Sequence, residues 1–395
     1  MDAQLTDLWR FLRPTLAQGL FAQVVSGTSG RLALFGPRRT GKTSLICREI
    51  LPLAKNAGLF PVYCDCWQDR KDPLGSILYA FKSALEALEV PTSKTGRVLK
   101  TEVKKLAAAG FSIEFGAEPR GEPPASPYFQ LDWLLGAIIA RARKPVFLII
   151  DEVQGIAEHK EAERIAGALR AAITRHEHAV RVLFTGSSET QLTKLFAATR
   201  ASLYQFASRV AYSPLDAEFV AHVAHRFHAA TRRQLNQGHA LEIFRLLGNQ
   251  PEAFLSVVQT PLALSDCSLQ TGLEALLSPH NNTPWTQYWR ESTALQQALL
   301  IAASDGFQVT TEEGLTRIGA LMGTTAKTAS SVSRAASALT TRGLIERSSL
   351  SSKSIYALTD PVFELWIRQN GAALLKGAMP LMGTRLPRTG HRWNV

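Results

Sequence analysis

The hydrophobic positions in the first half of the chain fall into short runs that predict buried strands. The runs lie at 32–35, 59–64, 146–150 and 182–184. Apolar runs without polar alternation are typical of strands buried on both faces of a parallel sheet. Between the runs, apolar residues recur at helical spacing over 74–88 and at Ile165, Leu169 and Ile173. This alternation of strands and helices predicts an α/β fold with a parallel sheet.

The second half of the chain reads as helices. From Asp216 to about Gln287, helical stretches are broken by glycine and proline, which is typical of a helical lid. Residues 293–368 predict a winged helix-turn-helix. Its helices are expected at 294–303, 315–321 and 326–341, and its hairpin strands at 344–347 and 354–358.

These patterns divide the chain into successive parts. We expect an N-terminal segment at 1–30, a core at 31–213 with an insertion at about 91–127, a lid at 214–290, a winged-helix domain at 291–369 and a flexible basic tail at 370–395. The insertion turns from basic to rich in glycine and proline, so it is either a hairpin around 111–115 or a mobile loop. The N-terminal segment contains an amphipathic stretch at 8–12.

Composition favours a globular protein, because 46% of the 395 residues are hydrophobic and 19% are charged. The first residues lack the order of a secretory signal, and Arg141, Arg143 and Lys144 interrupt the longest candidate membrane span. A cytoplasmic protein without a membrane segment is the simplest expectation. The 4 cysteines give no disulfide or metal-site spacing.

The net charge of +11 favours a polyanionic partner, most plausibly nucleic acid. A basic balance also occurs in proteins that merely stay soluble, so charge alone does not name the partner.

A phosphate-binding loop is the sharpest chemical signal. Residues 36–43 read GPRRTGKT, which satisfies the pattern G-x-x-x-x-G-K-[ST] between a predicted strand and a predicted helix. Backbone N–H groups and the helix N-terminus of such a loop hold a polyphosphate. The nucleotide contacts are expected from Gly36, Pro37, Arg38, Arg39, Thr40, Gly41, Lys42, Thr43 and Ser44. Lys42 would bridge the β- and γ-phosphates of ATP, and the Thr43 hydroxyl would coordinate Mg²⁺.

An acidic pair follows the strand at 146–150. Ligands bind at the carboxyl ends of parallel strands, so Asp151 is placed to hold Mg²⁺ and Glu152 to polarise a water. An ordinary acidic helix cap is the alternative. Beside the phosphate-binding loop, the pair indicates ATP hydrolysis, with Glu152, Lys42 and Asp151 as the catalytic residues.

The strand at 182–184 ends in small polar residues that could reach the γ-phosphate or the attacking water. Thr185, Ser187 and Ser188 are therefore the sensor candidates. Hydroxyl residues are also common in turns, so this signal depends on the other two motifs.

Together these motifs resemble the additional-strand branch of P-loop ATPases, and within it the AAA+ and STAND-related group called archaeal-type ATPases. The resemblance is carried by GPRRTGKT, by FLIIDE at 147–152 and by LFTGSS at 183–188. Residues 247–254 resemble the Gly-x-Pro segment of that group's lid, and 360–366 resemble the end of its winged helix. The resemblance implies that the sensor strand lies between the P-loop strand and the carboxylate strand.

Two departures from the AAA+ pattern concern arginines. Lids of that group often carry an arginine that contacts the γ-phosphate, but the segment around Gly248 and Pro251 supplies none. Oligomeric rings also take an arginine finger from a neighbour, for which Arg200 and Arg209 are the candidates. A solvated surface arginine is the alternative reading of each.

The predicted winged helix offers candidate contacts to duplex DNA. They are Lys327, Thr328, Ser331, Arg334, Arg342 and Lys353. Small polar residues and cations at the start of a recognition helix suit a DNA backbone, although winged helices also dock proteins.

We therefore expect a Mg²⁺-dependent ATPase whose nucleotide state gates DNA binding. One alternative is a STAND-like signalling scaffold whose winged helix contacts a protein effector. Another is an accessory ATPase of transposition or replication that assembles on DNA as an ATP-dependent homo-oligomer.

Overall fold

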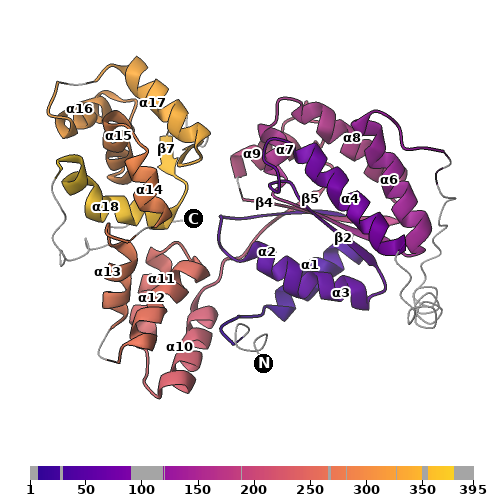
Figure 1. Ribbon diagram of the computed structural model, residues 1–395, viewed down its shortest axis with the longest axis horizontal. Coiled ribbons are helices and arrows are strands. Elements are labelled where there is room, and N and C mark those ends of the chain that lie inside the picture. The colour runs from indigo at the N-terminus through magenta and orange to yellow at the C-terminus, as the bar shows by residue number, and fades with distance from the viewer. Residues whose placement is uncertain are drawn as a thin grey trace. The chain divides into compact units, whose positions relative to one another are not determined.

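The computed structural model describes residues 8–26, 30–89, 119, 121–187, 189–265, 268–281, 283–325, 327–348 and 355–377. These residues form two compact units, divided between Pro214 and Leu215, with residues 8–10 belonging to the second unit. Each unit is shown in Figure 1. The expected hairpin around 111–115, the sensor candidate Ser188 and the wing residue Lys353 lie outside the described residues.

A five-stranded sheet forms the centre of the first unit, with the strand order β2–β3–β4–β1–β5 and every neighbouring pair parallel. Its strands are β1 (Arg31–Phe35), β2 (Phe60–Asp65), β3 (Val146–Asp151), β4 (Val180–Gly186) and β5 (Ser208–Ala211). The predicted α/β class is confirmed, and the sensor strand β4 lies between β1 and β3 as the resemblance implied. The edge strand β5 was not predicted, because its mostly exposed residues carry no apolar run.

Helices cover both faces of this sheet (Figure 1). They are α1 (Pro14–Ser26), α2 (Lys42–Leu45), the π-helical segment η1 (Ile46–Ile50), α3 (Leu51–Asn56), α4 (Pro73–Glu89), α6 (Pro127–Ala142), α7 (Gln154–Glu158), α8 (Ala162–Arg175) and α9 (Glu189–Phe196). Alternate strand residues divide between two apolar clusters, so that Phe147 and Ile149 pack towards α1 and η1 while Leu148 and Ile150 pack towards α4, α6 and α8. The first helix begins at Pro14, after the amphipathic stretch at 8–12.

The second unit contains the helices of the predicted lid and winged helix. The lid region comprises α10 (Ala217–Thr231), α11 (Gln237–Leu246), α12 (Pro251–Ala263), α13 (Leu269–Leu277) and α14 (Pro284–Arg290). The winged-helix region comprises α15 (Ala294–Ser304), α16 (Glu312–Leu321), α17 (Ala329–Thr341), the antiparallel strands β6 (Ile345–Ser348) and β7 (Ile355–Leu358), and α18 (Pro361–Leu375). The chain therefore has the fold class expected from its sequence.

The last helix corrects the expected start of the basic tail at residue 370. Helix α18 continues to Leu375, and Asn370 is buried inside the second unit. Its Nδ2 donates to the carbonyl oxygens of Leu277 at 2.8 Å and Trp366 at 3.0 Å. The helix continues past the buried Gly371 because residues 372–375, AALL, are strong helix formers.

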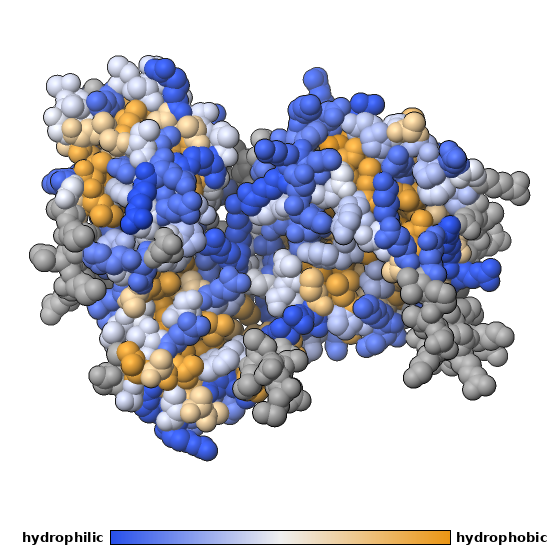
Figure 2. Space-filling view, in the orientation of Figure 1, coloured by the Kyte–Doolittle hydropathy of each residue, from blue (hydrophilic) through white to orange (hydrophobic). Residues whose placement is uncertain are grey.

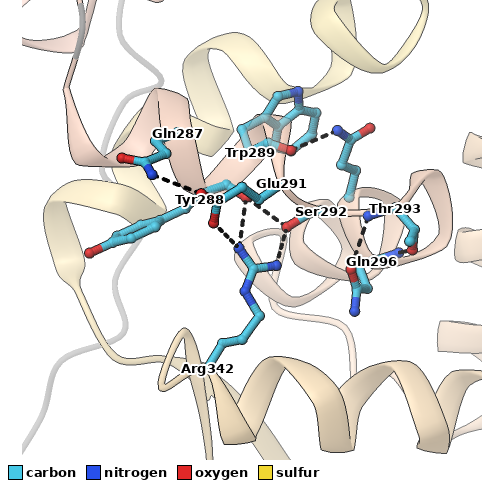
Figure 3. Close-up of polar contacts among 9 residues, drawn as sticks. Gln287, Tyr288, Trp289, Glu291, Ser292, Thr293, Gln296 and Arg342 are labelled. Carbon is cyan, nitrogen blue, oxygen red and sulfur yellow. Dashed lines mark hydrogen bonds and ion pairs between the residues drawn. The ribbon is translucent and has the colours of Figure 1, made fainter.

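A polar joint links the lid helix α14 to the winged helix inside the second unit (Figure 3). The guanidinium of Arg342, which follows α17, donates to the Ser292 Oγ at 3.0 Å and the Tyr288 carbonyl oxygen at 3.3 Å. It also forms an ion pair with Glu291 at 3.2 Å. Three hydrogen-bonding partners on one side of a single guanidinium fix its direction, so α14 and α17 are held in one arrangement.

Aromatic packing continues this joint along α18. The ring of Trp289 contacts that of Trp366 in an edge arrangement, with 5.9 Å between centroids, and Tyr288 meets Phe363 at 5.8 Å. The Asp360 carboxylate, which caps α18, accepts hydrogen bonds from Trp285 Nε1 at 3.1 Å and from Gln250 in the lid. The aromatic residues of α14 are therefore packing residues within this unit.

Hydrophilic residues cover most of the surface shown in Figure 2, and the hydrophobic patches among them are small and separate. Across the described parts of the chain, none of the helices combines the length and the hydropathy needed to cross a membrane.

We expect Arg342→Ala to lower the free energy of unfolding of the second unit by about 1–2 kcal/mol, because it leaves the Glu291 carboxylate and the Ser292 hydroxyl without their shared donor. Urea unfolding of the full chain, followed by tryptophan fluorescence, measures the change. Arg290→Ala removes the same charge from an exposed position on α14 and should change stability by less than about 0.5 kcal/mol. Equal stabilities of the two variants would contradict the structural role given to Arg342.

Candidate nucleotide site

The loop between β1 and α2 wraps around the side chain of Lys42. The Lys42 Nζ donates to the carbonyl oxygens of Gly36 at 2.8 Å and Pro37 at 2.5 Å, and the Thr40 hydroxyl donates to Pro37 at 2.8 Å. Gly41 has a φ of 95°, a backbone conformation that favours glycine. The loop geometry therefore brings the lysine ammonium group and the start of the helix to the carboxyl end of β1.

Burial lowers the pKa of the Lys42 ammonium group, while the charges of Glu152 and Asp151 act in the opposite direction. Only 5% of Lys42 is exposed. A buried cation that faces two carboxylates at the end of a parallel sheet is a strong anchor for a polyanion.

Tyr212 packs against the phosphate-binding loop. A Cβ atom on Gly36 would lie 2.8 Å from the Tyr212 Cβ, which is too close for any side chain, so this position requires glycine. The Tyr212 hydroxyl donates to the Thr40 carbonyl oxygen at 3.0 Å. These two contacts hold the phosphate-binding loop in position at the end of β1.

The Asp151 carboxylate, at the end of β3, is 1% exposed and accepts hydrogen bonds from three hydroxyl groups. Thr43 Oγ1 lies 3.0 Å and Tyr63 Oη lies 2.7 Å from its Oδ2, and the Thr185 hydroxyl donates to Oδ1. The structure thus brings together the predicted metal residues Thr43 and Asp151 and the predicted sensor Thr185. These donors satisfy a buried charge whose desolvation would otherwise be costly.

Tyr63 was not among the predicted site residues. It lies in β2, paired with Ile149 of β3, which places its side chain beside Asp151. Burial, together with the Asp151 charge and hydrogen bond, raises the pKa of the Tyr63 hydroxyl well above its ordinary value, so it stays a hydrogen-bond donor. The only signal in the sequence was its position at the end of a predicted strand.

The donors at this point suit Mg²⁺. Thr43 offers a hydroxyl oxygen and Asp151 a carboxylate oxygen, and hard oxygen donors are what Mg²⁺ prefers. Among the described residues, no group of three or more His, Cys, Asp or Glu side chains could hold a metal ion by itself. A site with one carboxylate and one hydroxyl fits an ion that takes its remaining ligands from water and nucleotide phosphates.

Glu152 is held by a second group of polar side chains. Its Oε2 accepts a hydrogen bond from Ser187 Oγ at 2.8 Å and another from Gln154 Nε2. The backbone of Glu152 is left-handed, with a φ of 51°. In a regular strand, the side chains of Asp151 and Glu152 would point to opposite faces of the sheet. The turn at Glu152 ends the strand, and both carboxylates lie at the same end of the sheet.

Gln154 is another residue that our sequence analysis missed. It is fully buried, and its amide contacts Ser187 as well as Glu152, with 2.8 Å between Nε2 and the Ser187 Oγ. The predicted sensor Ser187 is therefore a shared partner of both side chains. Gln154 follows the acidic pair by two positions, but a glutamine at the start of a helix carries no chemical signal of its own.

Arg38 connects the phosphate-binding loop to this group. Its Nε donates to Ser187 Oγ at 3.2 Å, and its guanidinium lies over the Trp67 ring, 4.5 Å from the centroid. The guanidinium of Arg70 also lies over this ring, at 4.1 Å. Of the other predicted loop residues, Pro37, Arg39 and Ser44 are exposed.

The two arginine-finger candidates lie on exposed positions of the first unit. Arg209 belongs to the edge strand β5, and its guanidinium lies over the Phe35 ring at 5.1 Å. Arg200 lies in the turns between α9 and β5. The structure therefore brings neither of them into the hydrogen-bonded groups around Asp151 and Glu152.

The DNA-contact candidates of the winged helix gather around the start of α17. Thr328 precedes this helix, Ser331 and Arg334 lie in its first turns, and the half-buried Lys327 comes directly before Thr328. The Thr328 hydroxyl donates to Ser331 Oγ at 3.0 Å. Arg342, at the other end of α17, is instead engaged in the joint with α14.

Proteins of known structure share this fold. A Walker-type ATPase of Pyrococcus abyssi is 15% identical, with a TM-score of 0.55 over 91% of this chain and 99% of that chain. The ORC2 protein of Aeropyrum pernix, solved as ADPNP-ADP complexes, is 12% identical, with a TM-score of 0.51 over 93% of this chain and 97% of that chain. No protein-family model and no curated protein matches the chain. The predicted resemblance to archaeal-type ATPases is confirmed at the level of the fold.

We expect Tyr63→Phe to lower the free energy of unfolding of the first unit by about 1–2 kcal/mol, because it removes a hydrogen bond to a buried carboxylate. Thermal and urea unfolding of the full chain measure the loss. Tyr79→Phe, at a position of α4 that is 59% exposed, removes the same hydroxyl from a solvated site and should change little. A Tyr63→Phe protein as stable as the parent would show that Tyr63 does not support Asp151.

Proposed function

We propose that the chain is a Mg²⁺-dependent ATPase that works in the cytoplasm and uses its nucleotide state to gate binding of the winged helix to duplex DNA. One observation carries the ATPase part of the proposal. At one edge of the sheet, Lys42, Asp151 and Glu152 are each held by named polar partners. An anion anchor, a metal ligand and a base are the three functions that hydrolysis of a nucleoside triphosphate requires.

In this proposal the Lys42 ammonium group exchanges the carbonyl oxygens of Gly36 and Pro37 for the β- and γ-phosphate oxygens. Thr43 and Asp151 would hold Mg²⁺, which, when bound, neutralises charge on the phosphates. Glu152 accepts a proton from a water whose oxygen attacks the γ-phosphorus, and the bridging oxygen leaves with ADP. Ser187 and Gln154 fix the direction of the Glu152 carboxylate, and Thr185 fixes that of Asp151.

Substitutions at Glu152 and Lys42 separate turnover from binding. Glu152→Gln should lower kcat about 100-fold or more while ATP affinity stays within a few-fold of the parent, because the amide cannot accept the proton. Lys42→Ala should weaken ATP binding as well as turnover, because it removes the anchor. Steady-state phosphate release and titration with a fluorescent ATP analogue measure the two effects.

Glu158→Gln, at an exposed position of α7, is the matched control and should retain the parent rate. If Glu152→Gln turned over ATP as fast as Glu158→Gln, the role of Glu152 as base would be wrong.

The DNA part of the proposal is supported by charge and by the winged-helix elements. The chain carries a net charge of +11, and the first turns of α17 expose a small polar surface with Arg334. A helix of this kind can approach a DNA backbone closely, while neighbouring cations contact phosphates.

Two other functions remain as alternatives to DNA gating. In a signalling scaffold, the winged helix would contact a protein effector. In an accessory ATPase of transposition or replication, ATP would drive assembly of homo-oligomers on DNA. Size measurements with and without ATP and DNA distinguish the second alternative from a monomeric switch.

We expect duplex DNA to bind with an affinity that falls steeply as salt increases, and Arg334→Ala or Lys327→Ala to weaken binding and reduce the salt slope by about one phosphate contact. Fluorescence anisotropy of a labelled duplex over a salt series, with ADP or a slowly hydrolysed ATP analogue, measures both effects. Arg290→Ala, on the lid, should leave the slope unchanged. Binding that does not respond to salt, or to nucleotide, would favour the protein-effector alternative.

A further inference from the structure

We propose that Arg38 acts in cis as the arginine that stabilises the transition state of hydrolysis, so that the chain completes its catalytic site without an arginine from a neighbouring copy. This inference rests on the proposed ATPase function and goes further by naming the source of the transition-state charge. Transfer of a phosphoryl group places negative charge on the equatorial oxygens of the γ-phosphate, and an arginine aimed at them accelerates the reaction greatly.

A chain of hydrogen bonds connects Arg38 to the proposed base Glu152. Arg38 Nε donates to Ser187 Oγ at 3.2 Å, and the same hydroxyl donates to Glu152 Oε2 at 2.8 Å. One hydroxyl group therefore separates the guanidinium from the carboxylate that takes the proton of the attacking water. If Glu152 takes the proton of the attacking water, a guanidinium at this place would face the γ-phosphate from the same side as that water.

Arg38 and Lys42 place two cations at the carboxyl end of the sheet. Arg38 Nε donates to Ser187 Oγ after β4, and Lys42 Nζ donates to the carbonyl oxygen of Gly36 after β1, the strand that pairs with β4. Two neighbouring cations at one edge of a sheet are unfavourable by themselves and become favourable when an anion lies between them. Lys42 is the predicted anchor of the β- and γ-phosphates, and Arg38 is placed to contact the same anion from the side of Glu152.

An aromatic ring supports the side chain of Arg38. Trp67 presents this ring to the guanidinium, which lies 4.5 Å from the ring centroid. The backbone N–H of Trp67 donates to Asp65 Oδ1 at 2.8 Å, which fixes the turn that carries the indole. The ring also packs against α7, where a Cβ on Gly155 would come within 3.1 Å of Trp67 Cδ1. Trp67 is therefore a positioning residue that limits the directions available to Arg38.

The chemical step remains an ordinary hydrolysis. A bond forms between the water oxygen and the γ-phosphorus, the bond to the bridging β-γ oxygen breaks, and the water proton passes to Glu152. Arg38 neither gains nor loses a proton. Its N–H groups donate hydrogen bonds to the γ-phosphate oxygens while the charge on these atoms increases.

We expect Arg38→Ala to lower kcat by at least about 100-fold while the affinity for ADP changes less than about threefold, because the lost interaction belongs to the transition state. A binding readout is independent of turnover. The affinity for ADP with aluminium fluoride, which mimics the transferring phosphoryl group, should fall at least about tenfold more than the affinity for ADP alone. Arg70→Ala removes the other guanidinium on the Trp67 ring and should retain the parent kcat within about twofold.

A mixing experiment tests whether Arg38 acts within its own chain. Glu152→Gln and Arg38→Ala, each inactive by itself, should stay inactive when mixed, and the parent rate per molecule should not depend on protein concentration. Recovery of activity in the mixture would show that one copy supplies its arginine to another, and would overturn the assignment in cis.

Trp67 provides a second test of position. Trp67→Leu should lower kcat about tenfold with an unchanged KM, and Trp67→Phe should restore most of the rate, because an aromatic face still supports the guanidinium. If Trp67→Leu altered only stability, Trp67 would be a structural residue that does not position Arg38.

The outcomes for Arg38 and for the ATPase itself are distinguishable. A parent protein that turns over ATP, with an Arg38→Ala variant that is equally fast and binds the aluminium fluoride complex equally well, overturns the role of Arg38 alone. A parent protein that binds ATP without hydrolysing it overturns the proposed function, and this inference with it.

Discussion

The buried carboxylate of Asp151 is the constraint on which the candidate site depends. A charged group that is 1% exposed is tolerated only if its oxygen atoms have strong donors, and here Thr43, Tyr63 and Thr185 supply hydroxyl groups. These donors come from the helix after β1 and from the strands β2 and β4 on either side of β3. The single charge therefore fixes the relative positions of the P-loop helix and three neighbouring strands. The same carboxylate thus contributes to the alignment of these elements and to the chemistry of the candidate site.

In the second unit, a shared interface between helices, instead of a buried charge, fixes the arrangement of the elements. The lid and the winged helix share an interface of aromatic rings along α14 and α18, with Arg342 and Asp360 as polar contacts within it. Such an interface resists bending, because both its apolar contacts and its directed hydrogen bonds would have to break together. A change of lid position in the proposed switch would then move the winged helix with it, as one body within this unit.

The sequence predicted the features that local patterns encode. Continuous apolar runs predicted β1, β3 and β4, and motif spacing placed Lys42 and Asp151 at their carboxyl ends. The edge strand β5 was missed, because a strand paired on one side only needs no continuous apolar run. Tyr63 and Gln154 were missed for another reason, since each acquires its role only through contacts with residues that are far away in the sequence or around a turn. Arg38 was assigned to the phosphates from its motif position, whereas its contacts with Ser187 and Trp67 required the folded chain.

The left-handed backbone of Glu152 lowers the stability of the fold at the position of the proposed base. A non-glycine residue at a φ of 51° carries a conformational cost that glycine would avoid, of about 1 kcal/mol or more. A residue without a side chain would fit this turn better, but it would carry no carboxylate. The proposed base therefore stands at a position where its own side chain costs folding energy.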